Sequence, residues 1–404
     1  MVELYIEGLK KSIAELEIDK ELEKYVIRHL GRILQAFGII LGLLLLPLSG
    51  CESYYEFSQE YGIGKNKPYR ILKRCSSTSW IRLLRRLGTK LLVKIVNRYH
   101  QMSEATKSRN KVTLELDSTT LLKLSEKLGL VGVFWSGKLK REASSIQLVV
   151  LYAVIGEGNL LIPLDMRIRR PDPEGPGRKC KEQPQLVIEM IRDLKTRCFA
   201  NSVDVKGWFV VMDSWYCSTE LIDKISHLGF FVIVEGKSNY VFFKEGNKER
   251  YNPSDLAEIV RWRDGIQRDI RYARVNVTSP TFGEVTLILF EDERGLRCLI
   301  TKPNVISGIR IIVAYKLRWW IEEFFKICKS YLKIEKFQMV KEEEVYGHIC
   351  LRMICFLLLC YCAKKVCSET IQKIVRKLNR YWFEWFPQIL ELQAFSQQSL
   401  SQDA

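Results

Sequence analysis

Several features are scarce or missing in this 404-residue sequence. Its 12 cysteines include no pair in a Cys-x2-Cys spacing, and none of its four histidines has a neighbouring motif that would make it a general base. No repeat of fixed period is evident, and the apolar run at 36–50 is shorter than the roughly 20 residues that span a bilayer. These absences argue against a zinc ribbon, a repeat protein and a membrane-spanning chain.

The composition is that of a globular protein with an anionic partner. Hydrophobic residues make up 47% and charged residues 27%, and the length predicts two to three domains. Lysine and arginine total 63 against 47 acidic residues, a net charge of +16, so nucleic acid is the first partner to consider. The irregular cysteines, with no signal peptide before them, predict a reducing cytoplasm.

The apolar run at 36–50 ends in LSGC and resembles a lipoprotein processing site at Cys51. More than thirty charge-rich residues precede it, whereas a secretory signal begins with a short basic region. We therefore expect a buried helix that ends at Pro47. A membrane-anchored lipoprotein, cleaved at Cys51, is the alternative.

A second apolar segment lies near the C-terminus. Five cysteines crowd into it beside His348: Cys350, Cys355, Cys360, Cys362 and Cys367. A zinc site is one interpretation, but without a Cys-x2-Cys pair we expect buried thiols in a core helix.

Residues 1–105 predict a helical, DNA-binding N-terminal region. A helix at 54–61 is followed by Gly62 and Gly64, and a second helix begins at Pro68, which suggests a helix-turn-helix at 51–75. A basic series follows that could lie against a phosphate backbone, and a solvated basic surface is the alternative. Its members are Arg70, Lys73, Arg74, Arg82, Arg85 and Arg86.

From 106 the sequence predicts an α/β domain with strands and helices in the order βββαβαβ, up to residue 239. Residues 240–312 predict an antiparallel β insertion with a turn at SPTFG. Helical periodicity resumes over 313–365, and 366–404 predict a helical tail with a disordered, polar end.

Two carboxylates lie at predicted strand ends. Asp117 ends the first strand, and Asp213 ends the buried strand WFVVMD. A charge at the end of an apolar strand is costly unless it is solvated, paired or bound to metal. Open α/β sheets also bind their ligands at strand ends.

A third carboxylate is selected by helical geometry in AYKLRWWIEEFFKICK. Arg318, Glu322 and Lys329 follow Tyr315 by three, seven and fourteen positions, so all four share one face of a single predicted helix. Glu323 lies about 100° from Glu322 around the helix. An ordinary surface array of ion pairs is the alternative.

The motifs LELDSTT and VVMDSWY and the spacing Tyr-x2-Arg-x3-Glu-x6-Lys are similar to those of DDE transposases of bacterial insertion sequences, in the subgroup with that signature. The resemblance covers roughly 111–363 and implies an RNase H-like core. It makes Asp117, Asp213 and Glu322 catalytic ligands of two Mg²⁺ ions, which Mn²⁺ can replace. The residue after Asp213 is serine, where relatives often have arginine or glycine.

The same resemblance assigns Tyr315, Arg318 and Lys329 to the phosphates of transposon-end DNA. We also expect Lys237, Arg70 and Arg74 to contact DNA.

The predicted function is metal-dependent cleavage and strand transfer at terminal inverted repeats, by a homodimer in the cytoplasm, at the nucleoid and not on a membrane. A repurposed, non-catalytic DNA-binding protein is the main alternative.

Two further alternatives concern single residues. Ser214 or Tyr216 as a nucleophile would make the protein a recombinase that forms a covalent link with DNA. Trp262, between Arg261 and Arg263, is either core filler or a platform for an extruded base.

Overall fold

The computed structural model describes most of the chain. The described residues are 2–30, 36–49, 51–100, 112–123, 128–137, 139–156, 160–171, 183–244, 249–265, 270–363, 370–382, 384–385, 387 and 389. Cys367 and the polar residues 396–404, about which the sequence makes predictions, lie outside these ranges.

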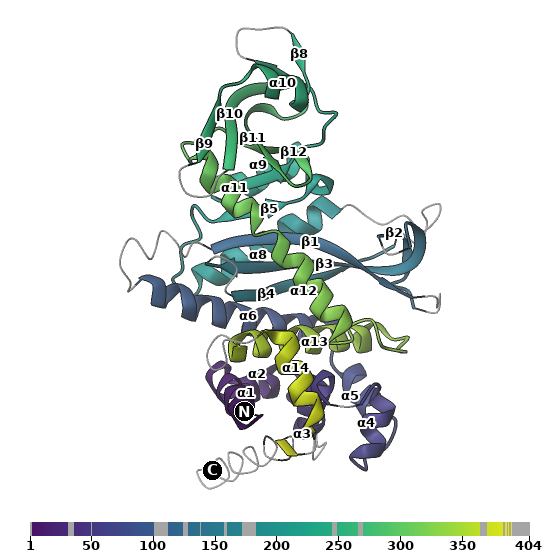
Figure 1. Ribbon diagram of the computed structural model, residues 1–404. Coiled ribbons are helices and arrows are strands. Elements are labelled where there is room, and N and C mark those ends of the chain that lie inside the picture. The colour runs from purple at the N-terminus through teal and green to yellow at the C-terminus, as the bar shows by residue number, and fades with distance from the viewer. Residues whose placement is uncertain are drawn as a thin grey trace.

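A mixed sheet forms the middle of the molecule (Figure 1). Its core strands run in the order β4-β3-β1-β5-β6, in which β3 is antiparallel to β1 and β4, while β1, β5 and β6 are parallel. Their bounds are β1 (Val112–Leu122), β3 (Arg141–Ile155), β4 (Leu160–Arg169), β5 (Phe209–Met212) and β6 (Phe231–Glu235). Helices α8 (Gln183–Phe199) and α9 (Thr219–His227) connect the later strands.

The predicted order βββαβαβ is confirmed, with one extra strand, β2 (Gly132–Ser136), that pairs with β3. β3 is buried continuously from Ile146 to Ile155, because both faces of a central strand are covered.

The chain between β6 and residue 302 forms mainly antiparallel strands at the top of Figure 1. The elements are β7 (Phe242–Lys244), β8 (Arg250–Tyr251), α10 (Pro253–Ile259), β9 (Trp262–Gly265), β10 (Ile270–Ser279), β11 (Gly283–Asp292) and β12 (Gly295–Thr301). The predicted turn lies between Ser279 and Gly283, whose φ of 66° suits glycine. β12 pairs with β6, so these strands extend the core sheet.

One helix of this segment was not predicted. α10 begins with Asn252, whose side chain accepts hydrogen bonds from the backbone N–H groups of Ser254 and Asp255, and Pro253 occupies its first turn. This arrangement is a capping box, so the sequence NPSD carried the signal.

The N-terminal region is helical, as predicted. It contains α1 (Val2–Leu16), α2 (Ile18–Tyr25), η1 (Ile27–His29), α3 (Ala36–Leu45), η2 (Leu46–Leu48), α4 (Tyr54–Glu60), α5 (Lys67–Arg74) and α6 (Ser77–His100). The buried helix α3 ends at Leu45 and passes into the 3-10 turn η2, because Pro47 has no backbone N–H to donate to the carbonyl four residues back.

The last part of the chain consists of α11 (Gly308–Lys316), α12 (Trp319–Ser330), α13 (Glu342–Cys362) and α14 (Ile371–Arg380). α13 lies between the N-terminal helices and the sheet, in contact with α1, α3, α5, α6 and β4 (Figure 1). By length and composition alone α13 could cross a membrane, but all of its apolar window is buried in this fold. Cys350, Cys355, Cys360 and Cys362 are buried in it, as predicted.

Candidate active site

Asp117 lies in the middle of β1, not at its end as predicted. β1 continues to Leu122 because it keeps its antiparallel pairing with β3, in which Asp117 is opposite Val150. The parallel pairing with β5 is shorter and ends at Leu116 and Met212. Asp117 is the next residue on β1 and Asp213 is the residue that follows β5, so the pairing brings their carboxylates close together. This place, where β5 ends beside β1, is the acidic edge of the sheet.

Local hydrogen bonds orient both aspartates. The backbone N–H of Ser118 donates to Asp117 Oδ1 at 2.7 Å, and that of Trp215 donates to Asp213 Oδ1 at 2.9 Å. The pKa of Asp117 is raised to about 7, mainly by burial and also by the nearby Asp213 carboxylate. Burial also raises the pKa of Asp213. The two groups therefore form a desolvated acidic pair that favours a bound cation.

The predicted single helix that carries Tyr315 to Lys329 is in fact two helices. α11 ends at Lys316, and α12 begins after Arg318. At the junction the backbone N–H of Arg318 donates to the carbonyl of Tyr315 at 2.9 Å, three residues back, which tightens the turn as in a 3-10 helix. Tyr315 and Arg318 therefore belong to different helices, and the calculated common face does not hold for all four residues.

Arg318 nevertheless reaches two of the predicted carboxylates. Its Nη1 lies 3.4 Å from Asp117 Oδ2, and its Nη2 lies 3.7 Å from Glu322 Oε1. α12 packs across β1, where the ring of Phe324 stacks on Tyr152 with 5.9 Å between the ring centroids. This packing places Glu322 near Asp117, whose raised pKa it contributes to.

Glu235 is a carboxylate of this region that the sequence analysis missed. It ends β6, the strand next to β5, and its charge contributes to the raised pKa of Asp213. Its carboxylate pairs with Arg297 of β12, and it also contributes to the raised pKa of the buried Tyr315. The signal was present, because FVIVE ends an apolar strand with a charge just as WFVVMD does.

Glu115 was also missed, although it is fully buried. The alternation L-E-L-D places it on the same face of β1 as Asp117, and it lies opposite Tyr152 on β3. Neither of its carboxylate oxygens has a hydrogen-bond partner in the part of the chain that the structure describes, and the same is true of the Tyr152 hydroxyl. Burial raises the pKa of Glu115 well above its ordinary value.

The donor groups suit a hard divalent cation, because Mg²⁺ prefers carboxylate oxygens. Their placement is not that of an assembled metal site. Among the described residues, no three His, Cys, Asp or Glu side chains are grouped so that they could hold one ion. Between Asp117 and Glu322 the structure places the Arg318 guanidinium instead.

The remaining predicted phosphate ligands differ in their surroundings. Lys329 Nζ donates to the backbone carbonyl of Thr120 at 2.9 Å and lies 3.3 Å from Glu335 Oε1. Lys237 is exposed and lines a cavity of about 500 Å³ together with Ser214 and Arg297.

A second cavity, of about 320 Å³, opens directly beside Arg318. The α11–α12 junction supplies part of its lining, and the β11–β12 turn supplies the rest. The lining residues are Asp292, Glu293, Arg294, Arg297, Tyr315, Lys316, Arg318, Trp319 and Glu322.

Trp262 is packed into the fold. Its indole N–H donates to the Ala257 carbonyl at 2.8 Å, and the Arg271 guanidinium lies 5.1 Å from the ring centroid. These contacts favour the interpretation as core filler.

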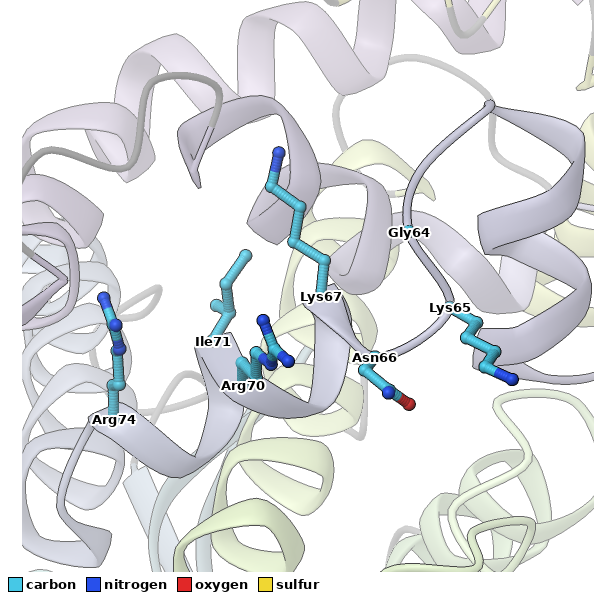
Figure 2. Close-up of a pocket in the computed structure, with 7 residues that line it drawn as sticks. All are labelled: Gly64, Lys65, Asn66, Lys67, Arg70, Ile71 and Arg74. Atoms are coloured by element: carbon cyan, nitrogen blue, oxygen red, sulfur yellow. The ribbon is translucent and has the colours of Figure 1, made fainter.

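A basic pocket of about 500 Å³ lies far from these carboxylates in the sequence, at α5 (Figure 2). Lys67, Arg70, Ile71 and Arg74 extend from one side of the helix, while Lys65 points in another direction. The spacing i, i+3, i+4, i+7 explains this common face. Arg70 is exposed, and Arg74 donates to the carbonyl of Leu30 at 3.1 Å.

Two members of the predicted basic series are paired with carboxylates of the chain itself. Arg85 Nη2 lies 2.8 Å from the buried Asp165, and Arg86 Nε lies 3.0 Å from Glu21 Oε1. Both are on α6, a separate helix that begins after α5 has ended, so the series is divided between two helices.

Comparison with known proteins supports the resemblance. Residues 181–358 match the family model described as the transposase DDE domain. The transposase for insertion sequence element IS231B of Bacillus thuringiensis subsp. berliner is 23% identical over 218 residues, 43% of this chain and 45% of that protein. The transposase for element IS231D of Bacillus thuringiensis subsp. finitimus is 24% identical over 217 residues, with the same coverage.

The chain is therefore similar to the DDE transposases of bacterial insertion sequences.

The alignments cover less than half the length of each transposase. The matched DDE segment includes Asp213 and Glu322, and it begins after Asp117. Among solved structures, the NurA nuclease from Sulfolobus solfataricus aligns with a TM-score of 0.25 and 10% identity, over 56% of this chain and 82% of that one.

Proposed function

We propose that this relative of the DDE transposases cleaves and joins DNA at the ends of an insertion sequence. The observation that supports the proposal is that two further carboxylates, Asp213 and Glu322, lie close enough to Asp117 to raise its pKa. Asp117 on β1 and Glu322 on α12 share the Arg318 guanidinium, and Asp213 follows the strand paired with β1.

Asp117, Asp213 and Glu322 are the residues that would hold two Mg²⁺ ions, or Mn²⁺ in their place. Such ions activate an attacking oxygen and stabilise a leaving oxygen on a phosphodiester. The protein's own part is to keep these carboxylates at a desolvated edge, where they hold cations and position the DNA backbone. No protein nucleophile is required, and Tyr216, with 3% of its surface exposed, is poorly placed to be one.

Basic residues around this edge supply the contacts to the DNA backbone. We propose that Arg318, Lys329, Lys237 and Tyr315 contact phosphates near the scissile bond. Arginine can bind a phosphate through two N–H groups and lysine as a point charge, so these contacts position the strand without selecting its sequence.

The N-terminal region, with a helix-turn-helix at 51–75, would bind the inverted repeats. The pocket at α5 supports this, because Arg70, Arg74 and Lys67 extend from one side of the helix (Figure 2). The acting form would be a homodimer at the nucleoid in the cytoplasm.

The test of catalysis is nicking of DNA that carries the inverted repeats flanking the gene. We expect Asp117→Asn, Asp213→Asn and Glu322→Gln to abolish nicking in Mg²⁺ while gel-shift binding of the repeats stays intact. Glu323→Gln is the matched control, since Glu323 pairs with Lys326 on the same helix and is not one of the three carboxylates. Mg²⁺-dependent nicking that persists in Asp117→Asn or Glu322→Gln would contradict the assignment.

The test of the N-terminal interface is the salt dependence of binding. Arg70→Gln with Arg74→Gln should lower the slope of log affinity against log salt by about 0.9 for each phosphate that the variant no longer neutralises. An unchanged slope would exclude α5 from the interface. Binding by the wild type with no cleavage in either Mg²⁺ or Mn²⁺ would favour the alternative, a repurposed DNA-binding protein.

A further inference from the structure

Arg318 lies where a divalent cation would have to bind. Its guanidinium is shared between Asp117 and Glu322 at 3.4 and 3.7 Å, longer than the 2.7–2.9 Å or so of a tight charge-assisted hydrogen bond. Arginine stays protonated in proteins, so its charge cannot be removed to admit a metal ion. The same carboxylate oxygens therefore serve either the guanidinium or a metal ion.

This arrangement accounts for the absence of an assembled metal site among the described residues. Asp117 comes from β1 and Glu322 from α12, and the guanidinium between them balances their charges. The side chain of Arg318 is 16% exposed, so it fills the space between the two elements. A metal ion needs Arg318 to leave first.

The adjacent cavity of about 320 Å³ provides space into which the Arg318 side chain can move. Arg318 already lines it, and Lys316 and Arg294 line it as well. Arg297, also in the lining, is paired with Glu235 and Asp292. The lining also contains the carboxylates of Asp292, Glu293 and Glu322, which its four basic side chains outnumber by one, and this surplus of positive charge favours a backbone phosphate of DNA.

We propose that this cavity is a phosphate subsite for DNA, and that its occupation draws Arg318 away from Asp117 and Glu322. The inference rests on the proposed function and adds a regulation to it. The carboxylates accept divalent cations well only when DNA is bound. The protein without DNA binds metal weakly, and Arg318 is the residue that couples the two ligands.

The first experiment measures Mn²⁺ binding to the full chain without DNA, from the electron paramagnetic resonance signal of free Mn²⁺. We expect Arg318→Gln to bind Mn²⁺ at least about tenfold more tightly than the wild type, because the competing charge is gone. Lys326→Gln, which removes one positive charge from the exposed side of the same helix, should leave the affinity unchanged. Arg318→Gln with Asp117→Asn should lose the gain.

The second experiment adds a short DNA duplex at low ionic strength and subtracts the Mn²⁺ bound by the duplex alone. The wild type should gain Mn²⁺ affinity when the duplex is present, and Arg318→Gln should gain much less. Equal gains in the two proteins would overturn the coupling.

Loss of Arg318 leaves Asp117 without its neighbouring cation, so the fold of the variant is checked by its thermal melting. Added Mn²⁺ should raise the melting temperature of Arg318→Gln more than that of the wild type, because an ion that binds the folded state stabilises it. The rise in melting temperature caused by Mn²⁺ can be measured even if the variant itself melts at a lower temperature than the wild type.

The outcomes separate the two proposals. If Asp117→Asn weakens Mn²⁺ binding but Arg318→Gln does not tighten it, the role of Arg318 is wrong and the metal site stands. If no variant changes Mn²⁺ binding, both the regulation and the proposed metal ligands are wrong.

Discussion

Lys329 donates a hydrogen bond of 2.9 Å from Nζ to the backbone carbonyl of Thr120, 209 positions earlier in the chain. Thr120 lies on β1, three residues after Asp117, and Lys329 lies in the last turn of α12. The same ammonium group is 3.3 Å from Glu335. Lys329 therefore fastens the helix that carries Glu322 to the strand that carries Asp117.

The first prediction concerns this link. Lys329→Met should lower the free energy of unfolding by about 1–3 kcal/mol, because it removes a charged hydrogen bond that is partly buried. Urea unfolding measures the change. Lys326→Met, on the exposed side of the same helix, should change it by less than about 0.5 kcal/mol. Equal effects of the two substitutions would contradict a special role for Lys329.

The second prediction concerns a buried ion pair under the sheet. Asp165 of β4 is fully buried, 2.8 Å from Arg85 and 3.7 Å from Arg167. Asp165→Asn should cost about 3–5 kcal/mol of stability, because it removes the fully buried partner of Arg85 and Arg167 and leaves them only the more exposed Asp193. Asp193→Asn touches the same arginines from a side chain that is 42% exposed, and should cost about 1 kcal/mol or less. A similar loss of stability in Asp165→Asn and Asp193→Asn would argue that the burial of Asp165 is unimportant.

The third prediction concerns the crossing of α6 over β4. A Cβ atom on Gly88 would lie 2.3 Å from the backbone carbonyl oxygen of Pro163, so the two elements cannot approach this closely with any other residue. Gly88→Ala should destabilise the protein by about 1–3 kcal/mol through this clash. Gly129→Ala, which meets no atom within 4 Å, is the control, and chemical denaturation of both variants gives the comparison. If Gly88→Ala left the stability unchanged, α6 would be free to move away from β4.

The fourth prediction concerns pH. His348 is buried on α13, with Nδ1 2.7 Å from the Tyr54 hydroxyl and Nε2 3.2 Å from the Ile334 carbonyl. Because a carbonyl only accepts, Nε2 carries the proton and Nδ1 accepts from Tyr54. Burial lowers the pKa of His348 well below its ordinary value, and the nearby Arg352 lowers it further.

The unfolded chain can protonate this histidine below about pH 6.5, whereas the folded chain cannot. The contribution to stability is therefore present above that pH and is lost as the pH falls, by up to about 1.4 kcal/mol for each pH unit. Urea unfolding at neutral and at mildly acid pH measures the free energy of unfolding that is lost on acidification. This loss should be smaller for His348→Gln than for the wild type. His227→Gln, at an exposed position, should keep the wild-type pH dependence.

The sequence predicted the order of the core strands because their patterns are long and apolar. β3 alone contributes a run of buried residues that no helix pattern explains. Asp213 was found correctly at a strand end because an apolar strand stops there. Asp117 was misplaced within its strand, since polar residues after it remain paired with β3 through the backbone, which composition does not reveal.

Other parts of the site depend on tertiary contacts. The break at Arg318 arises from backbone bonds to residues three positions back, and a helical pattern of side chains looks the same with or without it. The use of Arg85 in a buried pair depends on Asp165, 80 positions later, which no local pattern connects to it. The link from Lys329 to Thr120 is equally remote.

The position of α13 has a consequence for synthesis on the ribosome. The N-terminal helices emerge first, yet the apolar helix against which α1, α3 and α5 pack is made more than 200 residues later. Arg318 and Arg297, the cations of the acidic edge, also emerge long after Asp117. A nascent chain stopped before residue 342 already contains Arg318 and Arg297 but lacks α13, so its N-terminal helices have no complete core to pack against.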